Sequence, residues 1–354
     1  MMKKRLFLTV IFALTIMGAV SAQDRQKKFS CYPIGFYNLE NLFDTCHDAG
    51  KNDYDFLPDG SYQWTAMKYK SKLKNMSRVL SEMGTDKVPM GCVAIGVSEV
   101  ENANCLRDLC NQPPLKARDF QFVHIEGPDK RGVDCALLYN PKLFTVRDTK
   151  LVPYVYTQPQ DIEADRQTRG FFIVSGTLAD EHVTIIVCHL PSRFSGSEYR
   201  EQGGEQVRVV KDSLLNDDPN CKIMIMGDMN DDPTNRSMAV ALRGKANIEE
   251  VGPGDMYNPW YNVLVKEKRG TLKYQGAWNL FDQILLSPAL INKVNKKDFS
   301  SLKYFQHQVF DKPYLFNTEG RYKGDVKRTT AGGVWLDGYS DHLPVVVYLL
   351  KEQQ

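Results

Sequence analysis

Residues 222–233 read KIMIMGDMNDDP and join a short apolar run to a group of polar side chains. Residues 222–226, apolar after Lys222, predict a buried β-strand, because a short apolar run bounded by a turn is typical of a strand in a sheet core. Asp228 and Asn230 follow at its carboxyl end, in a segment whose composition also suits an ordinary turn. A rigid strand end can hold side chains to the tolerances that chemistry requires. We therefore take this junction as a candidate functional site.

The same junction of an apolar run with polar side chains recurs elsewhere in the chain. Alone, each polar residue has a structural interpretation as a helix cap, a turn residue or a surface histidine. Together they supply oxygen ligands for Mg²⁺, a carboxylate and an amide to hold a water, and imidazoles to neutralise an oxyanion. This set predicts divalent-metal phosphoester hydrolysis. The additional junctions are Asn38 after 34–37, Glu99 after 93–97, His189 after 183–188, Asp282 before 283–286, and Asp341 with His342 before 345–350.

The remaining sequence predicts strands that alternate with amphipathic helices. Residues 65–83 place apolar side chains at steps of three and four, which indicates a helix, and the lysines between them are interpreted as its solvated face. Further strands are expected over 120–125, 135–139 and 171–177, and helices over 198–215, 101–109 and 235–242. The chain shows no internal repeat and no long linker. The pattern predicts two stacked sheets covered by helices, with a doubly wound nucleotide-binding fold as the alternative.

Seven blocks of the sequence carry a resemblance to a known family. In order, they resemble the signature blocks of the endonuclease/exonuclease/phosphatase superfamily, the deoxyribonuclease-I-like enzymes, and most of all its exported bacterial branch. The match covers about residues 31–350. It implies an α/β fold, a four-layer α/β/β/α sandwich with two mixed β-sheets packed face to face and helices outside. The blocks are FYNLEN (36–41), SEVEN (98–102), RGVDCALLY (131–139), CHLPSR (188–193), GDMN (227–230), FDQI (281–284) and SDHLP (340–344).

The resemblance also implies a site at one edge between the sheets and a metal in it. Glu99 matches the principal Mg²⁺ carboxylate, and Asn38 and Asp341 would complete the metal site directly or through water. Glu40 and Glu101 lie close by in the sequence, so the choice of Glu99 depends on alignment to the motif. Mg²⁺ is the expected cofactor, with Mn²⁺ as a possible substitute.

The catalytic roles implied by the resemblance fall on five positions. Asp228 matches the aspartate that orients or deprotonates the attacking water, and Asn230 matches the amide that fixes this water. His189 matches the imidazole that contacts the scissile phosphate. His342 would lie opposite, oriented by Asp282. The sequence leaves both Asp228 and His342 open as general base, and we favour Asp228.

Arginines near these blocks are candidates for binding the substrate phosphate, because a guanidinium can bind phosphate with two hydrogen bonds. Arg193 is the best placed, four residues after His189, and Arg169 is a second candidate. For Arg169 and Arg166 a plain surface role is equally compatible with the sequence.

The first 22 residues have the features of a secretory signal peptide. Lys3, Lys4 and Arg5 precede an apolar run of about 15 residues, shorter than the ~20 of a spanning helix. We expect cleavage near Ala22, a periplasmic or secreted product without stable membrane insertion, and a single domain over 23–354. Removing the three basic residues changes the formal charge from +2 to −1. A near-neutral chain lacks the broad basic surface that grips duplex DNA.

The eight cysteines all lie after the expected leader. Export permits disulfides, and Cys105 with Cys110 is the most plausible local pair. Cys92, Cys135 and Cys188 lie in or beside strand-like runs, as does Cys221, so buried free thiols are the favoured interpretation for these four. No spacing typical of a zinc site is present.

The expected function is an exported metal-dependent phosphoester hydrolase, most plausibly a nuclease or phosphodiesterase acting on nucleic acid or nucleotides. The basic and aromatic residues of 299–339 would suit a single-stranded polymer, and a packed surface loop is the equal alternative. A lipid or inositol-phosphate phosphoesterase would need an exposed apolar hairpin, for which 256–261 is the only candidate. A catalytically silent binding module is the third hypothesis. No protein partner is indicated.

Overall fold

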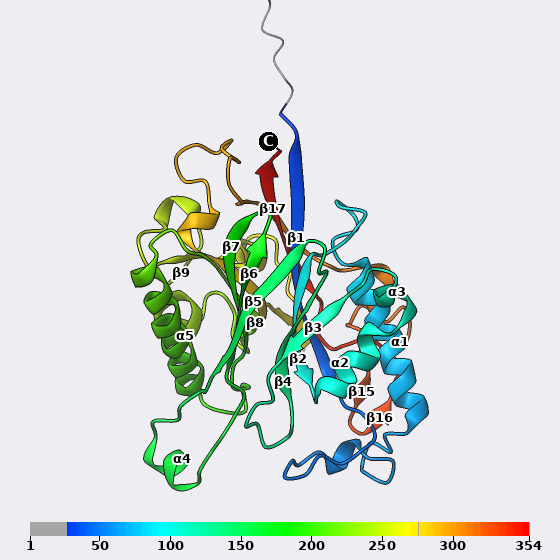
Figure 1. Ribbon diagram of the computed structural model, residues 1–354. Coiled ribbons are helices and arrows are strands. Elements are labelled where there is room, and N and C mark those ends of the chain that lie inside the picture. The colour runs from blue at the N-terminus through cyan, green and yellow to red at the C-terminus, as the bar shows by residue number, and fades with distance from the viewer. Residues whose placement is uncertain (1–26, 275, 354) are drawn as a thin grey trace, which may run out of the picture.

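The computed structural model describes residues 27–274 and 276–353. The expected leader, residues 1–22, lies outside the described residues. Two large sheets form the centre of the molecule (Figure 1). The six-stranded sheet has the order β14 (Lys303–Val309), β17 (Val345–Glu352), β1 (Phe29–Leu42), β2 (Ala94–Val100), β4 (Asp134–Tyr139) and β3 (Gln121–His124). The seven-stranded sheet has the order β5 (Phe144–Val152), β6 (Phe171–Leu178), β7 (Glu181–His189), β8 (Lys222–Asp228), β13 (Asp282–Leu286), β10 (Met256–Tyr257) and β9 (Gly244–Lys245).

Both large sheets are mixed, as expected. In the first, β1 is parallel to β2 and antiparallel to β17. In the second, β8 is parallel to β7 and antiparallel to β13. Two small hairpin sheets pair β11 (Leu272–Tyr274) with β12 (Ala277–Asn279) and β15 (Thr330–Ala331) with β16 (Val334–Trp335).

Helices cover the outer faces of the two sheets. In Figure 1, α1 (Ala66–Glu82), α2 (Ala103–Cys110) and α3 (Pro113–Lys116) lie beside the six-stranded sheet, and α5 (Ser197–Asp217) lies on the opposite side of the molecule. The arrangement is the α/β/β/α sandwich expected from the sequence. The other helical segments are α4 (Pro159–Glu163), α6 (Trp260–Val265), four 3₁₀ turns (Tyr54–Phe56, Ile248–Glu250, Pro288–Leu290 and Pro313–Leu315) and a π-helix (Ser237–Ala241). Within the described part of the chain, no helix is both long and apolar enough to cross a membrane.

Local sequence signals explain the first helix. The Thr65 side chain accepts a hydrogen bond from the backbone N–H of Lys68 and so caps the α1 N-terminus. Leu73, Met76 and Leu80 form the buried stripe that packs on the sheet.

The interpretation of Lys72 as part of a solvated face was wrong, because this side chain is fully buried. Its ammonium donates to the carbonyl of Tyr339 (2.7 Å) and to the hydroxyl of Thr329. A lysine inside the helix layer therefore holds the segment that leads into β17.

The two sheets approach each other closely at Gly96 of β2. A Cβ atom at this position would lie 2.5 Å from the Met226 sulfur on β8, closer than such atoms pack. Phe36, Val97 and Met226 belong to one buried cluster that spans both sheets. The absence of a side chain at residue 96 therefore sets the spacing of the sheets near the strand ends that carry the polar residues.

Two other expectations were wrong, and the edge strands β5 and β14 were missed. Residues 235–242 form a π-helix over Ser237–Ala241 rather than an α-helix. Residues 256–261 do not form an exposed apolar hairpin, because Met256, Tyr257 and Trp260 are buried. The strands β5 and β14 were not predicted, since edge strands with many polar residues lack a clear apolar run.

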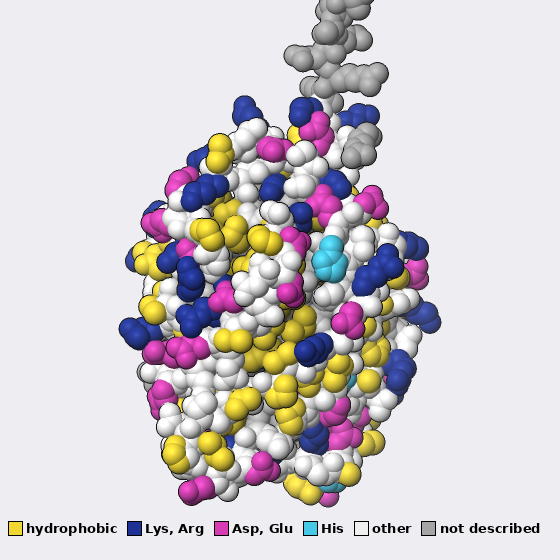
Figure 2. Space-filling view, turned by 60° about the vertical axis from the view of Figure 1, so that its left-hand side comes forward, with side chains coloured by type: hydrophobic (Ala, Val, Ile, Leu, Met, Phe, Trp, Pro, Cys, Tyr) yellow, Lys and Arg dark blue, Asp and Glu magenta, His cyan; other side chains and the backbone are white. Residues whose placement is uncertain are grey.

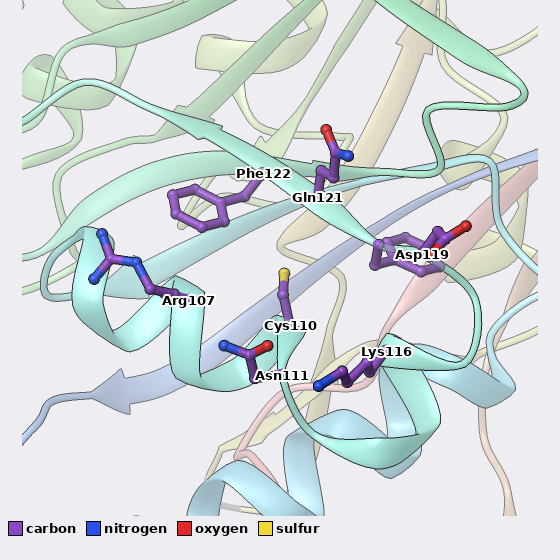
Figure 3. Close-up of a pocket in the computed structure, with 8 residues that line it drawn as sticks. Arg107, Cys110, Asn111, Lys116, Asp119, Gln121 and Phe122 are labelled. Atoms are coloured by element: carbon purple, nitrogen blue, oxygen red, sulfur yellow. The ribbon is translucent and has the colours of Figure 1, made fainter.

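The cysteines in the described residues are all free, including Cys105 and Cys110. The Cys105 thiol lies 3.5 Å from a Glu101 carboxylate oxygen. Cys110 lies in a hollow between α2, α3 and β3, beside Asn111 and Phe122 (Figure 3). Burial raises the pKa of the Cys110 thiol to about 12, which keeps it protonated and unreactive. The expected Cys105–Cys110 pair is therefore wrong.

Candidate active site

Strand register brings the polar strand ends of both sheets together. In the seven-stranded sheet, Asp228 on β8 is the register partner of His189 on β7 and of Asp282 on β13. In the six-stranded sheet, Asn38 on β1 is opposite Ser98 on β2. The two sheets meet at this edge, where the Asn38 amide nitrogen donates to an Asp228 carboxylate oxygen at 3.0 Å. These two residues, 190 positions apart in the sequence, thus share one site.

A β-bulge aims the Glu99 carboxylate into this site. Glu99 has a left-handed backbone (φ 60°), and the register of β2 shifts on both of its neighbours at this point. Bulges redirect side chains and are frequent beside functional sites. One carboxylate oxygen accepts the Asn41 backbone N–H (2.9 Å), and the other accepts the Asn38 amide (3.3 Å). The carboxylate is therefore fixed in direction before any ligand binds.

The geometry distinguishes Glu99 from the two neighbouring glutamates. Glu40 accepts the backbone N–H of Thr329 (2.6 Å) and pairs with Arg328, so its carboxylate is used to fasten a loop. Glu101 accepts the Asp44 N–H (2.7 Å) and lies 3.5 Å from the Cys105 thiol. Only Glu99 of these three lines the cleft that contains the histidines.

The oxygen donors at this edge suit Mg²⁺. Ligand atoms of Glu99, His189 and Asp228 all lie within 4.8 Å of one another, and Asp341 lines the same cleft. Several carboxylates gathered at one point favour a hard divalent cation, which prefers oxygen ligands. The Asn38 oxygen accepts the Glu40 N–H (2.8 Å), so in this arrangement Asn38 offers its amide nitrogen to the carboxylates. Asn38 therefore positions both carboxylates. The ligand atoms that the structure gathers most closely are those of Glu99, Asp228 and His189, whereas Asp341 lines the same cleft and pairs with Arg328 at 3.0 Å.

His342 is held as a charged imidazole by the residues around it. Its Nδ1 lies 2.7 Å from an Asp282 oxygen, and its Nε2 lies 3.8 Å from Asp228. Burial opposes the charged form, but the negative charges of Asp282 and Asp228 outweigh it and raise the pKa of His342 well above the usual range. Asp282 is fully buried, and its second oxygen has no hydrogen-bond partner among the described residues. The hydrogen bond to His342 is therefore the one contact found for the Asp282 carboxylate among the described residues, and it orients the imidazole.

His189 differs from His342 in its electrostatic environment. Burial, together with the charges of Arg169 and Arg131, lowers the pKa of His189 well below its usual range, so this imidazole is neutral. Its Nε2 lies 3.6 Å from Asp228 and 3.7 Å from Glu99. Its Nδ1 is buried, and no described residue provides it with a partner.

Asp228 lies between the two imidazoles. Burial raises the pKa of Asp228 to about 7, against the opposing effect of the His342 charge. A carboxylate whose pKa is near neutrality is suited to accept a proton from water at physiological pH. One Asp228 oxygen accepts the Asn38 amide, and the other accepts the Asn230 backbone N–H (2.9 Å). The Asn230 side-chain amide donates to the Leu190 carbonyl (3.0 Å). Asn230 therefore lies beside Asp228, held by the end of β7.

The two predicted substrate-binding arginines occupy different places. Arg169 lines the cleft and donates to Asp129 (3.0 Å), and its buried Nε has no partner within the described ranges. Arg193 is not among the residues that line the cleft. Its guanidinium donates to the Asn230 carbonyl (3.2 Å) and to Asp232 (3.0 Å), and lies over the Phe281 ring. In this structure Arg193 braces the loop after β8.

The cleft extends beyond the predicted residues and has a volume of about 460 Å³. Its other wall includes Arg131 and the fully exposed Phe194, neither of which the sequence identified as a site residue. Arg131 opens one of the family-like sequence blocks, which is the signal that could have drawn attention to it. Phe194 follows the CHLPSR block directly and carries no sequence signal of its own.

Comparison with known proteins supports the fold. No curated protein is similar enough to this chain to be identified as a relative. The chain is similar to the crystal structure of an endonuclease/exonuclease/phosphatase family protein from Bacteroides thetaiotaomicron (TM-score 0.55, 14% identity, 92% of this chain and 100% of the other). It is also similar to D. rerio TDP2 complexed with a single-strand DNA product (0.52, 14%, 90% and 99%) and to a Bacteroides thetaiotaomicron mannosyl-6-phosphatase (0.53, 15%, 90% and 99%).

The sequence itself identifies the family. Residues 33–351 match the sequence pattern of the Endonuclease/Exonuclease/phosphatase family, which covers most of the chain. The strand ends described above are the positions at which the family-like blocks meet in space. The chain therefore belongs to the Endonuclease/Exonuclease/phosphatase family, whose members are phosphoester hydrolases.

Proposed function

We propose that this protein is an exported, Mg²⁺-dependent phosphodiesterase that cleaves nucleic acid by attack of water on phosphorus. One observation carries the proposal. A buried carboxylate, Asp228, lies between a neutral imidazole and a charged one, beside the fixed carboxylate of Glu99. This arrangement offers a proton acceptor, a cationic donor and a cation-binding carboxylate within one cleft, as hydrolysis of a phosphoester requires.

Each residue would have a separate role in this reaction. Asp228 would accept a proton from the attacking water, with Asn230 beside it to fix that water. His342, charged and held by Asp282, would donate to an oxygen of the phosphoryl group. His189, whose imidazole is neutral, would contact the scissile phosphate. A neutral ring would not compete with the bound cation for the phosphate oxygens. Asp228 is favoured over His342 as the base, because an imidazole kept charged cannot accept a proton.

Glu99 and Asp341 would hold the Mg²⁺ ion, with Asn38 directing Glu99. When bound, the cation would neutralise charge that develops on the phosphoryl oxygens. Mn²⁺, which also accepts oxygen ligands, would be a working substitute. The basic start and the apolar run of residues 1–22 support export to the periplasm or the medium.

The proposal is tested with a panel of substrates, assayed with Mg²⁺, with Mn²⁺ and with excess EDTA. The panel contains single-stranded DNA, RNA, bis-p-nitrophenyl phosphate, sphingomyelin and a sugar monophosphate. We expect cleavage of the nucleic acids and of the small diester with either metal, and none in EDTA. Cleavage of only the lipid or the sugar monophosphate would contradict the proposed substrate class, and activity in EDTA would contradict the metal.

Variants assign the activity to this site. Asp228→Asn and His342→Asn should each lower kcat by roughly 10²- to 10⁴-fold, the usual contribution of a proton-transfer group. His182→Asn is the matched control, because His182 is an exposed imidazole on the same strand as His189. Equal activity of Asp228→Asn and wild type would remove Asp228 from the mechanism.

A further inference from the structure

The cleft has two ends with different charge. Its catalytic end carries the carboxylates of Glu99, Asp228 and Asp341. Its other wall carries three arginines, Arg131, Arg166 and Arg169, with Asp129 as the one carboxylate among the described residues that line this part. A cation bound at the first end would neutralise the scissile phosphate. The arginines supply positive charge to the same cleft, to which a second anionic group of the substrate could bind.

Arg131 is the arginine of this wall with most capacity left for a ligand. Arg169 is buried and donates to Asp129 and to the Leu190 carbonyl, and Arg166 donates to Asp161 (2.9 Å) and to Ser195 (3.1 Å). The Arg131 side chain is 51% exposed, and its Nε is 3.8 Å from Asp129, beyond hydrogen-bonding distance.

The loop that carries Arg131 is held in place before any ligand binds. The Lys51 ammonium donates to the carbonyls of Gly127 (2.8 Å) and Asp129 (3.2 Å). The backbone N–H of Asn52 donates to the Lys130 carbonyl (2.6 Å). The backbone of the loop is therefore fixed, while the Arg131 guanidinium has no hydrogen-bond partner within reach of its Nε among the described residues. Such a side chain is preorganised to bind phosphate.

Phe194 is presented on the same wall by a second braced loop. Its side chain is fully exposed, which is unusual for a large apolar group at the mouth of a cleft. The buried Arg200 donates to the carbonyls of Ser192 (3.0 Å) and Ser195 (3.1 Å) on either side of it. A rigid turn thus displays an aromatic ring that the described residues leave open to solvent, so the ring is available to stack on a base.

We propose that Arg131 and Phe194 form a subsite for the nucleotide that flanks the scissile phosphate, and that the substrate is single-stranded nucleic acid. This inference rests on the proposed function. Arg131 binds the neighbouring phosphate and Phe194 stacks on a base, which are the two contacts typical of single-strand recognition. A sugar monophosphate has neither group. On the face shown in Figure 2, lysine, arginine and carboxylate side chains are intermixed with apolar ones.

The test compares a substrate that reaches the subsite with one that does not. Steady-state kinetics are measured on a hexathymidylate and on methyl p-nitrophenyl phosphate, which has a single phosphorus, no base and no aromatic group besides the leaving group. Arg131→Ala and Phe194→Ala should each raise KM for the oligonucleotide by roughly tenfold, as expected for losing one charged contact or one stacked base. Both variants should change kcat/KM for the small diester by less than about twofold.

Two exposed residues outside the cleft provide matched controls. Arg147→Ala on β5 removes an exposed guanidinium, and Phe305→Ala on β14 removes a ring that is 51% exposed. Both controls should match wild type on both substrates. Similar losses on the oligonucleotide and the small diester would place Arg131 or Phe194 at the scissile phosphate and overturn the subsite, as would wild-type kinetics of both variants.

A binding measurement separates failure of the subsite from failure of the proposed function. Fluorescence anisotropy of a labelled hexathymidylate is followed against salt concentration for wild type and Arg131→Ala. Loss of one phosphate contact should reduce the slope of log affinity against log salt by about 0.7. If the wild-type protein hydrolyses no diester, the proposed function fails. The change in the salt dependence of binding between wild type and Arg131→Ala still tests the subsite in that case. An unchanged slope with active wild type overturns the subsite alone.

Discussion

At the scale of single residues, opposite protonation of the two histidines is the central property of the site. His189 and His342 are both buried, and burial acts on both in the same direction. For His342 the charges of Asp282 and Asp228 and a direct hydrogen bond to Asp282 outweigh burial. For His189 burial dominates, and the charges of Arg169, Arg131 and His342 add to it. The sequence could predict the pairing of Asp282 with His342 through the family resemblance. It could not predict these charges, because they depend on neighbours from other parts of the chain, such as Arg131.

Replacing Asp282 with asparagine should reverse the protonation of His342. The variant loses the nearest negative charge, so the pKa of His342 should fall and the charged form should become scarce at neutral pH. We expect kcat to decrease by about 10- to 100-fold, the usual effect of removing a residue that orients a catalytic group. Titration of His342 by NMR, alongside kinetics, checks both. An unchanged titration with unchanged kcat would contradict this role of Asp282.

At the scale of elements, the sequence predicted strands and helices well where an apolar pattern was continuous. The runs that became β1, β2, β7, β8 and β17 are largely buried, and the α1 stripe repeats at helical spacing. Polar edge strands were missed because the apolar signal is absent there. Lys72 was misinterpreted because a periodic pattern does not reveal that loop residues, here Thr329 and Tyr339, cover that side of the helix.

The edge strand β14 should make stability depend on pH through His307. Burial lowers the pKa of His307, whose ring lies against Trp260 and 2.5 Å from the Tyr304 hydroxyl. Below a pH of about 6.5 the unfolded chain binds a proton at this position more readily than the folded one. Stability from the neutral ring is therefore present above that pH and lost as pH falls through it.

His307→Gln provides the test, because glutamine cannot titrate. Urea unfolding of wild type and variant is measured between about pH 8 and about pH 5, which brackets the usual histidine range. The stability advantage of wild type should be largest at the alkaline end and should shrink with falling pH, by at most about 1.4 kcal/mol per pH unit for one group. A constant difference across this range would show that His307 titrates alike in both states.

At the scale of the whole molecule, the family resemblance predicted the face-to-face sheets, but strand order could not be derived from composition or periodicity. Strand order depends on which strands meet across the core. The sequence carries this information only in pairs of residues that fit each other in space, such as Gly96 and Met226. The single domain over 23–354 and the cleavage of a leader stay predictions. The site residues at the strand ends could be predicted, because strand register brings them together. Arg131 and Phe194 could not, because they lie on loops.

The contact of Gly96 with Met226 should control the spacing of the two sheets. Gly96→Val should lower the free energy of unfolding by about 1–3 kcal/mol, because the new side chain overlaps the Met226 sulfur. Urea denaturation measures this. In a Met226→Ala background the same valine should cost less, since space has been made for it. Equal costs in both backgrounds would mean that the sheets do not press on each other at this point.

The pairing of the first strand with the last also determines when the protein can become active. Ser340 donates to the backbone carbonyl of Asn38 across 302 positions of the sequence, and residues 29–36 of β1 pair with β17. Contacts of such high sequence separation form slowly and late. The catalytic group cannot assemble until the segment with His342 and β17 pairs with β1, so a chain that lacks this last segment should be inactive.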